Sequence, residues 1–570
     1  MVGDTELHDQ LCCKFGARSS TVKYICRHCK CPTEHLIDPL YQPSCQLWLP
    51  DDYEVPVNIS PNHWKSLSHH NVKNSFYNID FGMNPHNIHL ASPGECLHMH
   101  QLGNAKRAIE CFEHRVLHVP VKGTAFEKQT ANRPKAFAEF SNLAFNYGFS
   151  LSRQSERCLP RTRFSADILS PTKKNGKDYP AVILCVLVSL LSAQGKSILN
   201  ESAKIPTQSL KKFVCAFEQI LFFNAFFEKC ELPIAKVPKL NSVVARFMTL
   251  YTKTFSRGGM GNCLIKNHLF FHLQKYVEMF GPPAGWDSSC CEGHHKTDIK
   301  APSKITQRHA STLIKQTCQR KMEQIWLDRA RTCNVNFCCA PIIQQNQRKH
   351  IAGSTYKLFR VDGNSHMKWD GTHNQLKAHL PKQTIDHCCQ AFIPNNNECG
   401  EIRCFTEHNC CFDGSSESTK FRSNPSYRSD DGSKCSVWYD WAHFKYHDAI
   451  TETEKTTPAQ ILCFVHLTDD QANYADLDGA GPYAVVRSFK KEPSPIPPSK
   501  IVTVGELDNH HYVYHCDSIA GPAAVVKNHG DASLHNKFFV VSNSNHWLRC
   551  FHSLFDQEDN KNNNNNFDTG

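Results

Sequence analysis

The stretch QSLKKFVCAFEQILFFNAFFEK, residues 208–229, contains no Gly or Pro and is apolar on nearly all sides when wound as a helix. A helix that is apolar all round is buried on all sides, so this stretch predicts a buried helix.

Two further helices are predicted. One covers residues 262–280 and ends at the Gly-Pro-Pro of residues 281–283, a combination that stops helices. The other covers about residues 303–331.

The last part of the chain has a different pattern. Six short strand-like runs, separated by Gly-Pro, Asn-His-Gly and Pro-rich turns, lie at residues 461–465, 483–487, 501–504, 511–514, 523–526 and 538–542. Strands of this length and spacing predict a small antiparallel barrel. Residues 333–457 are rich in Cys, Asn, Ser and Gly, show little periodicity and predict no particular fold.

Composition narrows the class of protein. Of the 570 residues, 40% are hydrophobic and 21% are charged, which excludes wholesale disorder and collagen-like structure. The longest apolar stretch, residues 181–191, is well short of the roughly 20 residues that span a bilayer, so we expect no membrane helix. The N-terminus lacks the basic and apolar regions of a secretory signal. We therefore expect an intracellular protein, nuclear or cytoplasmic, whose 29 cysteines are thiols or metal ligands.

Charge is unevenly distributed along the chain. The net charge is +10, but residues 101–330 hold 34 basic and 17 acidic residues, which leaves 30 basic and 37 acidic residues for the rest. A basic segment of this kind favours a polyanionic partner, most often nucleic acid. A solvated basic surface is the alternative. The candidate phosphate-binding residues are Arg153, Arg157, Arg161 and Arg163 around a proline, and Lys296, Lys300, Lys304 and Arg308 at four-residue spacing.

Cys26-Arg-His-Cys29 is a pattern that presents two thiolates to one tetrahedral Zn²⁺ ion. Nothing near it resembles an open site with a general base, so the predicted zinc is structural. One or two of Cys12, Cys13, Cys31 and Cys45, or a distant His, would complete the site. The predicted ligands are Cys12, Cys26, Cys29 and Cys31, and the alternative is a set of reduced, buried thiols.

His268 and His272 have the i, i+4 spacing that places two imidazoles on one helix face. No third ligand is evident beside them, so we interpret them as packing residues near Glu292. An unrelated cytosolic metalloenzyme built on this pair is a further hypothesis.

Three carboxylates stand in short motifs. Asp4 lies in Gly3-Asp4-Thr5, Glu95 in Glu95-Cys-Leu-His98, and Glu292 in Glu292-Gly-His-His295. Taken singly, each is typical of a surface residue or a helix N-cap.

Taken in order, these motifs resemble those of eukaryotic DDE transposases of the CACTA type and their relatives. The resemblance rests on Gly3-Asp4 with Cys26-x-x-Cys29, on Glu95-x-x-His98, on the arginines of residues 153–164, and on Cys291-Glu292-x-x-His295-Lys296. It covers about residues 1–330 and, more loosely, the final β domain.

The resemblance implies a ribonuclease-H-like core in which two Asp and one Glu hold Mg²⁺ for DNA cleavage and strand transfer. Asp4 corresponds to the second Asp and Glu292 to the final Glu, while Glu95, His98 and His295 are supporting motif residues. The first Asp belongs upstream of Asp4, where only three residues precede it. We therefore expect the C-terminal part of a transposase, inactive as it stands.

The expected fold class is α/β plus all-β. Residues 1–115 form a partial core with a Cys-rich zinc loop, residues 116–255 a helical insertion, and residues 256–332 the return of the core with the Glu292 helix. An irregular Cys-rich linker (333–457), a small antiparallel β domain (458–556) and a disordered Asn-rich tail (557–570) follow.

Two functional hypotheses remain open. The first is a transposase-derived protein whose ancestor cut and joined DNA with Mg²⁺. The second is a non-catalytic, zinc-stabilised DNA-binding or protein-interaction protein on the same scaffold. Both predict DNA or a protein as partner and no membrane, and a homo-oligomer is compatible with either.

Overall fold

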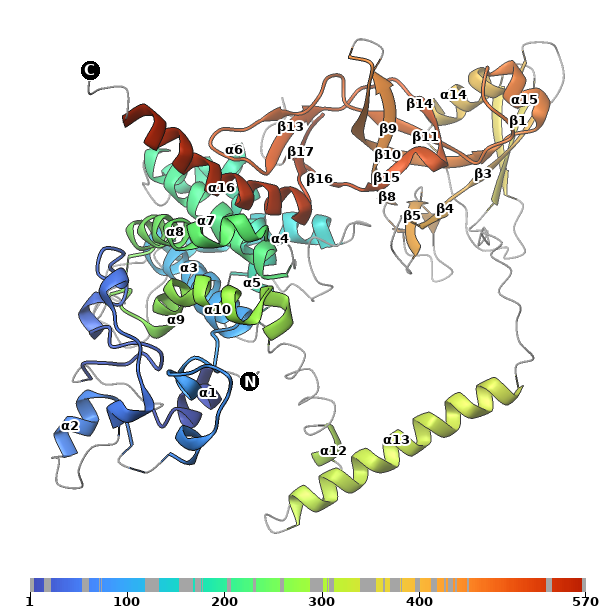
Figure 1. Cartoon of the computed structure of the whole chain (residues 1–570). Coiled ribbons are helices and arrows are strands. Elements are labelled where there is room, and N and C mark those ends of the chain that lie inside the picture. Colours follow the sequence, from blue (N-terminus) through green and yellow to red (C-terminus); the bar gives the residue numbers. More distant parts are fainter. Residues whose placement is uncertain are drawn as a thin grey trace.

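The computed structural model describes residues 5–14, 22–53, 61–70, 72, 74–117, 133–152, 168–169, 176, 178–201, 207–228, 232–256, 261–287, 301–304, 306, 312–338, 355–361, 364–369, 380, 382–394, 400–411, 418–424, 427–428, 434–435, 438–448, 451–528 and 536–565. Helices gather at one end of the molecule and antiparallel sheets at the other (Figure 1). The fold is therefore a mixture of helices and antiparallel sheets.

The helical body is built around α7 (Thr207–Glu228), and the prediction of a buried helix here is confirmed. From Val214 onward nearly every side chain of α7 is buried, because neighbouring helices cover it on all sides. The helices α5 (Asp178–Leu191), α8 (Leu240–Thr254) and α16 (Ser544–Asn565) contact α7 directly, and α3 (Lys106–Cys111), α4 (Arg133–Ser152) and α6 (Ala193–Glu201) pack against α5.

The predicted helix at residues 262–280 is present in three consecutive pieces. It consists of α9 (Ile265–His268), a 3₁₀ turn (Leu269–His272) and α10 (Leu273–Phe280). Gly281 ends it with a φ of 74°, a left-handed conformation that favours glycine. The tighter 3₁₀ turn lies in the middle of this run, where the two histidines of the candidate site are found.

The N-terminal segment, residues 5–117, differs from the expected partial core. Its described residues contain short helices such as α1 (Thr5–Leu11) and α2 (Pro61–Ser66), and backbone pairing is limited to the isolated bridges Lys14↔His69 and Cys29↔Leu47. No strand ladder of a ribonuclease-H-like core lies in this part of the described chain. Contacts between aromatic rings and the buried Lys14 side chain stabilise the segment instead. In one cation–π contact, Lys14 Nζ lies 4.7 Å from the centroid of the Trp48 ring.

The predicted strands of residues 458–552 are present, but the described sheets are open and form no closed barrel. The reason is that the strands divide between two sheets. The larger sheet takes β10 (Thr453–His466), β11 (Tyr483–Ser488) and β14 (Tyr512–His515) in the order β14-β11-β10-β3-β1-β2. The smaller sheet has the order β12-β13-β17-β16, with bounds Ser494–Pro495, Val502–Glu506, Lys537–Val541 and Ala524–Lys527.

Residues 355–448, for which the sequence predicted no fold, supply further strands. The larger sheet takes β1 (Thr355–Val361), β2 (Asn364–Trp369), β3 (Glu401–Phe405) and β9 (Trp441–Asp448), and β9 also pairs with β15 (Ile519–Pro522). Two helices accompany them, α14 (Lys382–Phe392) and α15 (Asp469–Tyr474). The short strands β4 (Glu407–Cys411), β5 (Ser418–Asn424), β6 (Tyr427–Arg428), β7 (Lys434–Cys435) and β8 (Trp438–Tyr439) form two small sheets.

The smaller sheet shares one hydrophobic core with the helical body. At their junction the buried carboxylate of Glu218 on α7 accepts hydrogen bonds from Ser499 Oγ (2.5 Å) and from the backbone N–H of Lys500 (2.9 Å). The helix α16 lies against α7 (Figure 1) and continues to Asn565, into the range expected to be a disordered tail. The C-terminal sheet and helix thus belong to the same packed unit as α7.

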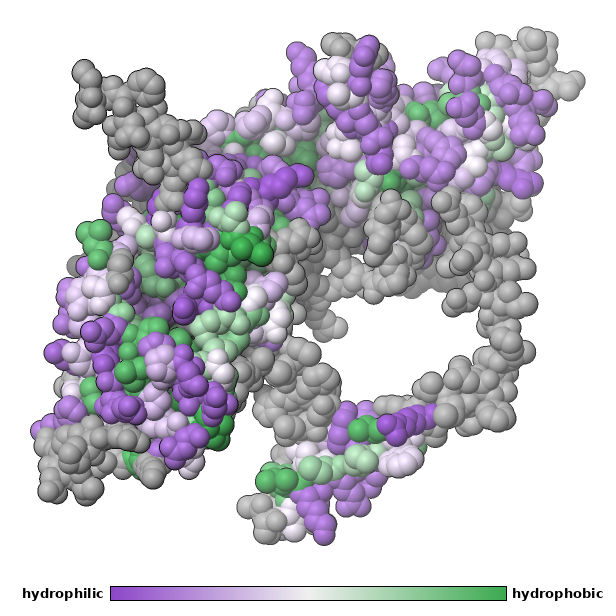
Figure 2. Space-filling view, viewed as in Figure 1, coloured by the Kyte–Doolittle hydropathy of each residue, from purple (hydrophilic) through white to green (hydrophobic). Residues whose placement is uncertain are grey.

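One long helix, α13 (Leu313–Cys338), lies apart from the rest of the described chain and follows the short α12 (Ala301–Ser303) (Figure 1). It begins and ends later than the helix predicted at residues 303–331. Ile314, Met322, Trp326 and Leu327 of this helix are exposed, and hydrophobic residues are visible on its surface (Figure 2). In the part of the chain that the structure describes, no single helix is long and apolar enough to cross a membrane, whereas α5 and α6 pass that test only as a pair bent by 82°.

Candidate metal centre

Cys26 and Cys29 lie on a tight loop of the N-terminal segment. The loop is held by the bridge from Cys29 to Leu47 and by the indole of Trp48, whose Nε1 donates to the Cys26 carbonyl at 2.9 Å. Within the loop, the backbone N–H of His28 donates to Cys26 Sγ at 3.3 Å. Both thiols are fully buried. The loop therefore turns its two sulfur atoms inward, toward the helical body.

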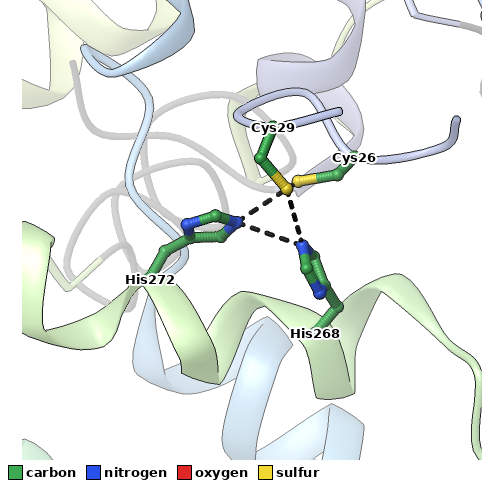
Figure 3. Close-up of side chains that lie close together, drawn as sticks. All are labelled: Cys26, Cys29, His268 and His272. Carbon is green, nitrogen blue, oxygen red and sulfur yellow. Dashed lines mark hydrogen bonds between the residues drawn. The ribbon is translucent and has the colours of Figure 1, made fainter. Parts of the chain in front are cut away.

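Two imidazoles from α9 and the following 3₁₀ turn meet these thiols (Figure 3). The distance from Cys29 Sγ to His268 Nε2 is 3.1 Å, and the distance from Cys26 Sγ to His272 Nε2 is 3.5 Å. The two Nε2 atoms lie 3.1 Å apart, and all four ligand atoms lie within 4.8 Å of one another. The spacing of four residues brings both rings to the same side of the helical run.

This donor set fits a tetrahedral metal ion. With bonds of about 2.3 Å to sulfur and 2.0–2.1 Å to nitrogen, neighbouring ligand atoms of a tetrahedral site lie roughly 3.3–3.8 Å apart, close to the observed distances. His268 Nδ1 lies 2.9 Å from the carbonyl of Leu36, which orients the ring and leaves Nε2 for a metal. All four side chains are buried. The group is closed, with four protein ligands and no open position among them.

The protonation of the four groups is tightly linked. Burial opposes ionisation of Cys26, but hydrogen bonding to Cys29 and the charges of His268 and His272 hold the pKa of Cys26 well below its ordinary value. Burial also opposes the charge on His268, yet the neighbouring Cys26 raises the pKa of His268 to about 9. Burial lowers the pKa of His272, and burial with neighbouring thiols raises the pKa of Cys29 well above its ordinary range.

These shifts predict a steep pH dependence of metal binding. A metal ion must displace the protons on His268 and Cys29, because it binds neutral imidazole and thiolate. Protons compete with the metal, so affinity falls as pH falls below about 9, the pKa of His268. With two protons displaced, we expect the apparent association constant for Zn²⁺ to rise about a hundredfold per pH unit between about pH 6 and 8. Competition titrations with a chromogenic chelator at several pH values measure this association constant. A constant that does not change with pH would contradict the assignment of protons to His268 and Cys29.

A buried ion pair lies beside the site. Arg27, between the two cysteines, lies 3.2 Å from a carboxylate oxygen of Asp9 and donates from Nε to the carbonyl of Ser92 at 3.1 Å. The ring of His28 packs edge-on against Tyr276 of α10 at 5.3 Å between centroids. The residues between the two cysteines therefore tie the loop to α1, to the segment before residue 95 and to α10.

The ligand set differs from the predicted one at two positions. Cys26 and Cys29 belong to the group, whereas Cys12 points elsewhere, with Sγ 3.8 Å from the carbonyl of Ile88. Cys31 follows Cys29 by two residues and is buried, but it is not one of the four. In their place stand the two histidines that we interpreted as packing residues. The signal that identifies them was available: a Cys-x-x-Cys lacking two ligands and a His-x-x-x-His lacking two ligands complete each other.

Glu95 takes the role of an N-cap, the simpler of its two interpretations. Its carboxylate accepts hydrogen bonds from the backbone N–H of Leu97 (2.6 Å) and His98 (2.9 Å) at the start of a π-helix, Cys96–Ala105. The same carboxylate pairs with the His98 ring. Glu95 and His98 are therefore one local unit in the described structure.

Most of the other predicted site residues lie outside the described residues. They are Asp4, Arg153, Arg157, Arg161, Arg163, Glu292, His295, Lys296, Lys300 and Arg308. The expected proximity of Asp4 and Glu292 thus remains a prediction. Lys304 is described, and it is exposed directly after α12.

No protein-family model matches the chain, and no curated protein matches it either. Three features of the chain bear on its function: the four-residue group, the uneven charge distribution and the motif resemblance.

Proposed function

We propose that this chain is a transposase-derived DNA-binding protein whose N-terminal segment is fastened to its helical body by a structural Zn²⁺ ion. The observation that carries the proposal is the buried group of Cys26, Cys29, His268 and His272, which joins residues up to 246 positions apart. A closed set of two thiolates and two imidazoles is a common structural zinc site. The same set offers no position for a substrate, which argues against a metalloenzyme built on His268 and His272.

The order of the motifs supports the transposase origin. Cys-x-x-Cys, Glu95-x-x-His98, a long helical stretch and Glu292 follow one another as in the DDE transposases that the sequence resembles. In this proposal α4 to α8 are the helical insertion, and the zinc ion holds the chain on either side of it. A complete ancestor would bind Mg²⁺ through its carboxylates, and Asp4 and Glu292 are the members of that set in this chain.

The proposal predicts salt-sensitive DNA binding without DNA cleavage. Phosphate contacts from residues 101–330 need no metal, and if six or more form, affinity falls about a thousandfold or more between 50 and 200 mM salt. Residues 1–570 taken alone offer two assigned carboxylates, Asp4 and Glu292, to a site that uses three; one ligand fewer removes several kcal/mol of transition-state stabilisation, and each 1.4 kcal/mol is a factor of ten in rate. The test uses one preparation of the full chain with Mg²⁺ for two assays: retention of a labelled duplex at two salt concentrations, and cleavage of supercoiled DNA.

Two variants sharpen this test. Replacing Arg153, Arg157, Arg161 and Arg163 together by Gln should reduce both affinity and its salt dependence, since about one counterion is released per phosphate contact. A matched replacement by Gln of Lys445, Lys455 and Lys537, which lie on the sheets, and of Lys490, which lies two residues after β11, should change neither. DNA affinity that changes neither with salt concentration nor on replacement of these arginines would contradict the proposal. Mg²⁺-dependent cleavage that Glu292→Gln abolishes would show instead that the chain is an active nuclease.

A further inference from the structure

Three basic side chains gather where the π-helix Cys96–Ala105 passes into α3. Lys106 and Arg107 are the first two residues of α3, and the backbone N–H of Lys106 donates to the carbonyl of Gly103. Lys266 on α9 extends across Gly103, because a Cβ atom at Gly103 would lie 3.4 Å from Lys266 Cδ and 3.5 Å from Lys266 Cβ. The Lys266 stem therefore lies against the turn that precedes Lys106 and Arg107.

The helical spacing places these three cations on one side of the run. Residues three and four positions after Gly103 are its neighbours on the helix surface, with Cβ atoms about 5–6 Å apart. Lys106 and Arg107 hold these two positions, so both flank the stem of Lys266. All three side chains are half-buried rather than fully exposed. Each therefore has fewer conformations to lose when it binds a ligand.

Two carboxylates lie along the same run. Glu110 lies 3.8 Å from Lys106 Nζ in a partly exposed i, i+4 pair, an arrangement that contributes little to stability. Glu95 accepts hydrogen bonds from the backbone N–H groups of Leu97 and His98 and pairs with the His98 ring. Three cations against these two carboxylates leave the group with a net positive charge. Like charges at a half-buried position repel one another, and an anion that binds there relieves the repulsion.

We propose that Lys106, Arg107 and Lys266 bind phosphate groups of the DNA backbone. The guanidinium of Arg107 has the fork geometry that holds two oxygens of one phosphate, and the two ammonium groups contact phosphate oxygens as point charges. The inference rests on the proposed DNA-binding function and assigns part of its phosphate contacts to named side chains. Because α9 also carries His268 of the metal centre, a bound metal ion would fix the helix from which Lys266 extends.

The test is the salt dependence of duplex binding by the full-length, Zn²⁺-loaded protein, measured by the fluorescence anisotropy of a labelled duplex. Affinity falls with about the 0.9 power of the salt concentration for each phosphate contact. Lys106→Gln/Arg107→Gln/Lys266→Gln removes three such contacts if each residue binds one phosphate. The ratio of the affinities at 50 and 200 mM salt should therefore fall about fortyfold relative to the wild type.

Two variants separate the loss of these contacts from a loss of folding. Lys106→Arg/Arg107→Lys/Lys266→Arg keeps all three charges and should keep most of the salt dependence. Arg107→Gln alone lies outside the helix that carries His268, and it should lower the same ratio about threefold, the effect of one contact. Metal content should equal that of the wild type in every variant.

A charge-matched control lies elsewhere in the basic part of the chain. Lys135 on α4, Lys196 on α6 and Lys275 on α10 are exposed. Replacing them together by Gln removes the same number of charges and should leave the affinity and its salt dependence as in the wild type.

The outcomes separate this inference from the proposed function. If Lys106→Gln/Arg107→Gln/Lys266→Gln keeps the salt dependence of the wild type, the inference is wrong and the proposed function stands on other contacts. If wild-type binding itself does not depend on salt, the proposed function fails. Displacement of the duplex by inorganic phosphate at constant ionic strength would overturn the assignment to the DNA backbone and indicate a site for a free phosphate group.

Discussion

Removal of the metal is expected to release residues 22–53 from the helical body. Apparent binding free energies of structural Zn²⁺ in small domains are about 10–16 kcal/mol at neutral pH, as large as the whole stability of a typical domain. Besides the metal, the segment is held by the Arg27–Asp9 ion pair, by the contact of the His28 ring with Tyr276 and by small hydrophobic clusters, while backbone pairing among its described residues is limited to isolated bridges. Chelation, Cys26→Ser or His272→Ala should therefore each increase amide hydrogen exchange in residues 22–53 by at least a hundredfold.

A matched variant distinguishes metal loss from the loss of any buried histidine. His100 is as buried as His268 but is not one of the four ligands; its Nε2 lies 3.0 Å from the carbonyl of Ile220 on α7, and its ring packs against Phe227 and Phe270. His100→Ala should lower the thermal stability of the helical body yet leave metal content and the chelator response unchanged. Equal protection of residues 22–53 before and after chelation would show that packing, not metal, holds the segment.

The two cysteines of the metal centre were predicted from the sequence, whereas its two histidines were not assigned as ligands. Cys26 and Cys29 are recognisable because two thiols three residues apart present two ligands to one ion regardless of the fold. His268 and His272 have an equally local spacing, but their metal role depends on a partner more than 200 residues away. The two incomplete motifs suggest each other in the sequence, and the folded chain shows them paired, with α9 and the following turn facing the loop after residue 22 (Figure 3).

Helices and strands were likewise predictable where the signal lies within one continuous stretch of sequence. The apolar stretch of α7 predicted its own burial, because a helix that is apolar on every side has no face for water. The strands after residue 458 were predictable one at a time, whereas their division between two sheets was not, since β10 pairs with β9 and β3 from a region without periodicity. Cys12 was misassigned as a ligand because proximity in sequence to Cys26 does not determine the direction of its side chain, which lies toward Ile88.

Among single apolar substitutions, we expect the largest loss of folding stability at the contact between α16 and α7. Phe551 is fully buried, and its ring lies 4.6 Å from Phe226, stacked, and 5.1 Å from Phe223, edge-on. Truncation of a buried Phe to Ala costs about 3–5 kcal/mol, through lost transfer free energy and the cavity that remains. We therefore expect Phe551→Ala to lower the free energy of unfolding of the helical body by that amount, measured by urea denaturation followed by tryptophan fluorescence.

Two comparisons show whether the cost arises at this contact. Phe76, half-buried in the N-terminal segment, meets Phe81 only at 6.4 Å between ring centroids, so Phe76→Ala should cost less than about 1 kcal/mol. Substitutions at sites without shared partners are additive, so Phe551→Ala should leave the metal content of Cys26 and His272 unchanged. If Phe551→Ala instead cost no more than Phe76→Ala, α16 would not be part of the core. The shared core of α7, α16 and the smaller sheet predicts the opposite, because one cavity beneath Phe551 loosens all three.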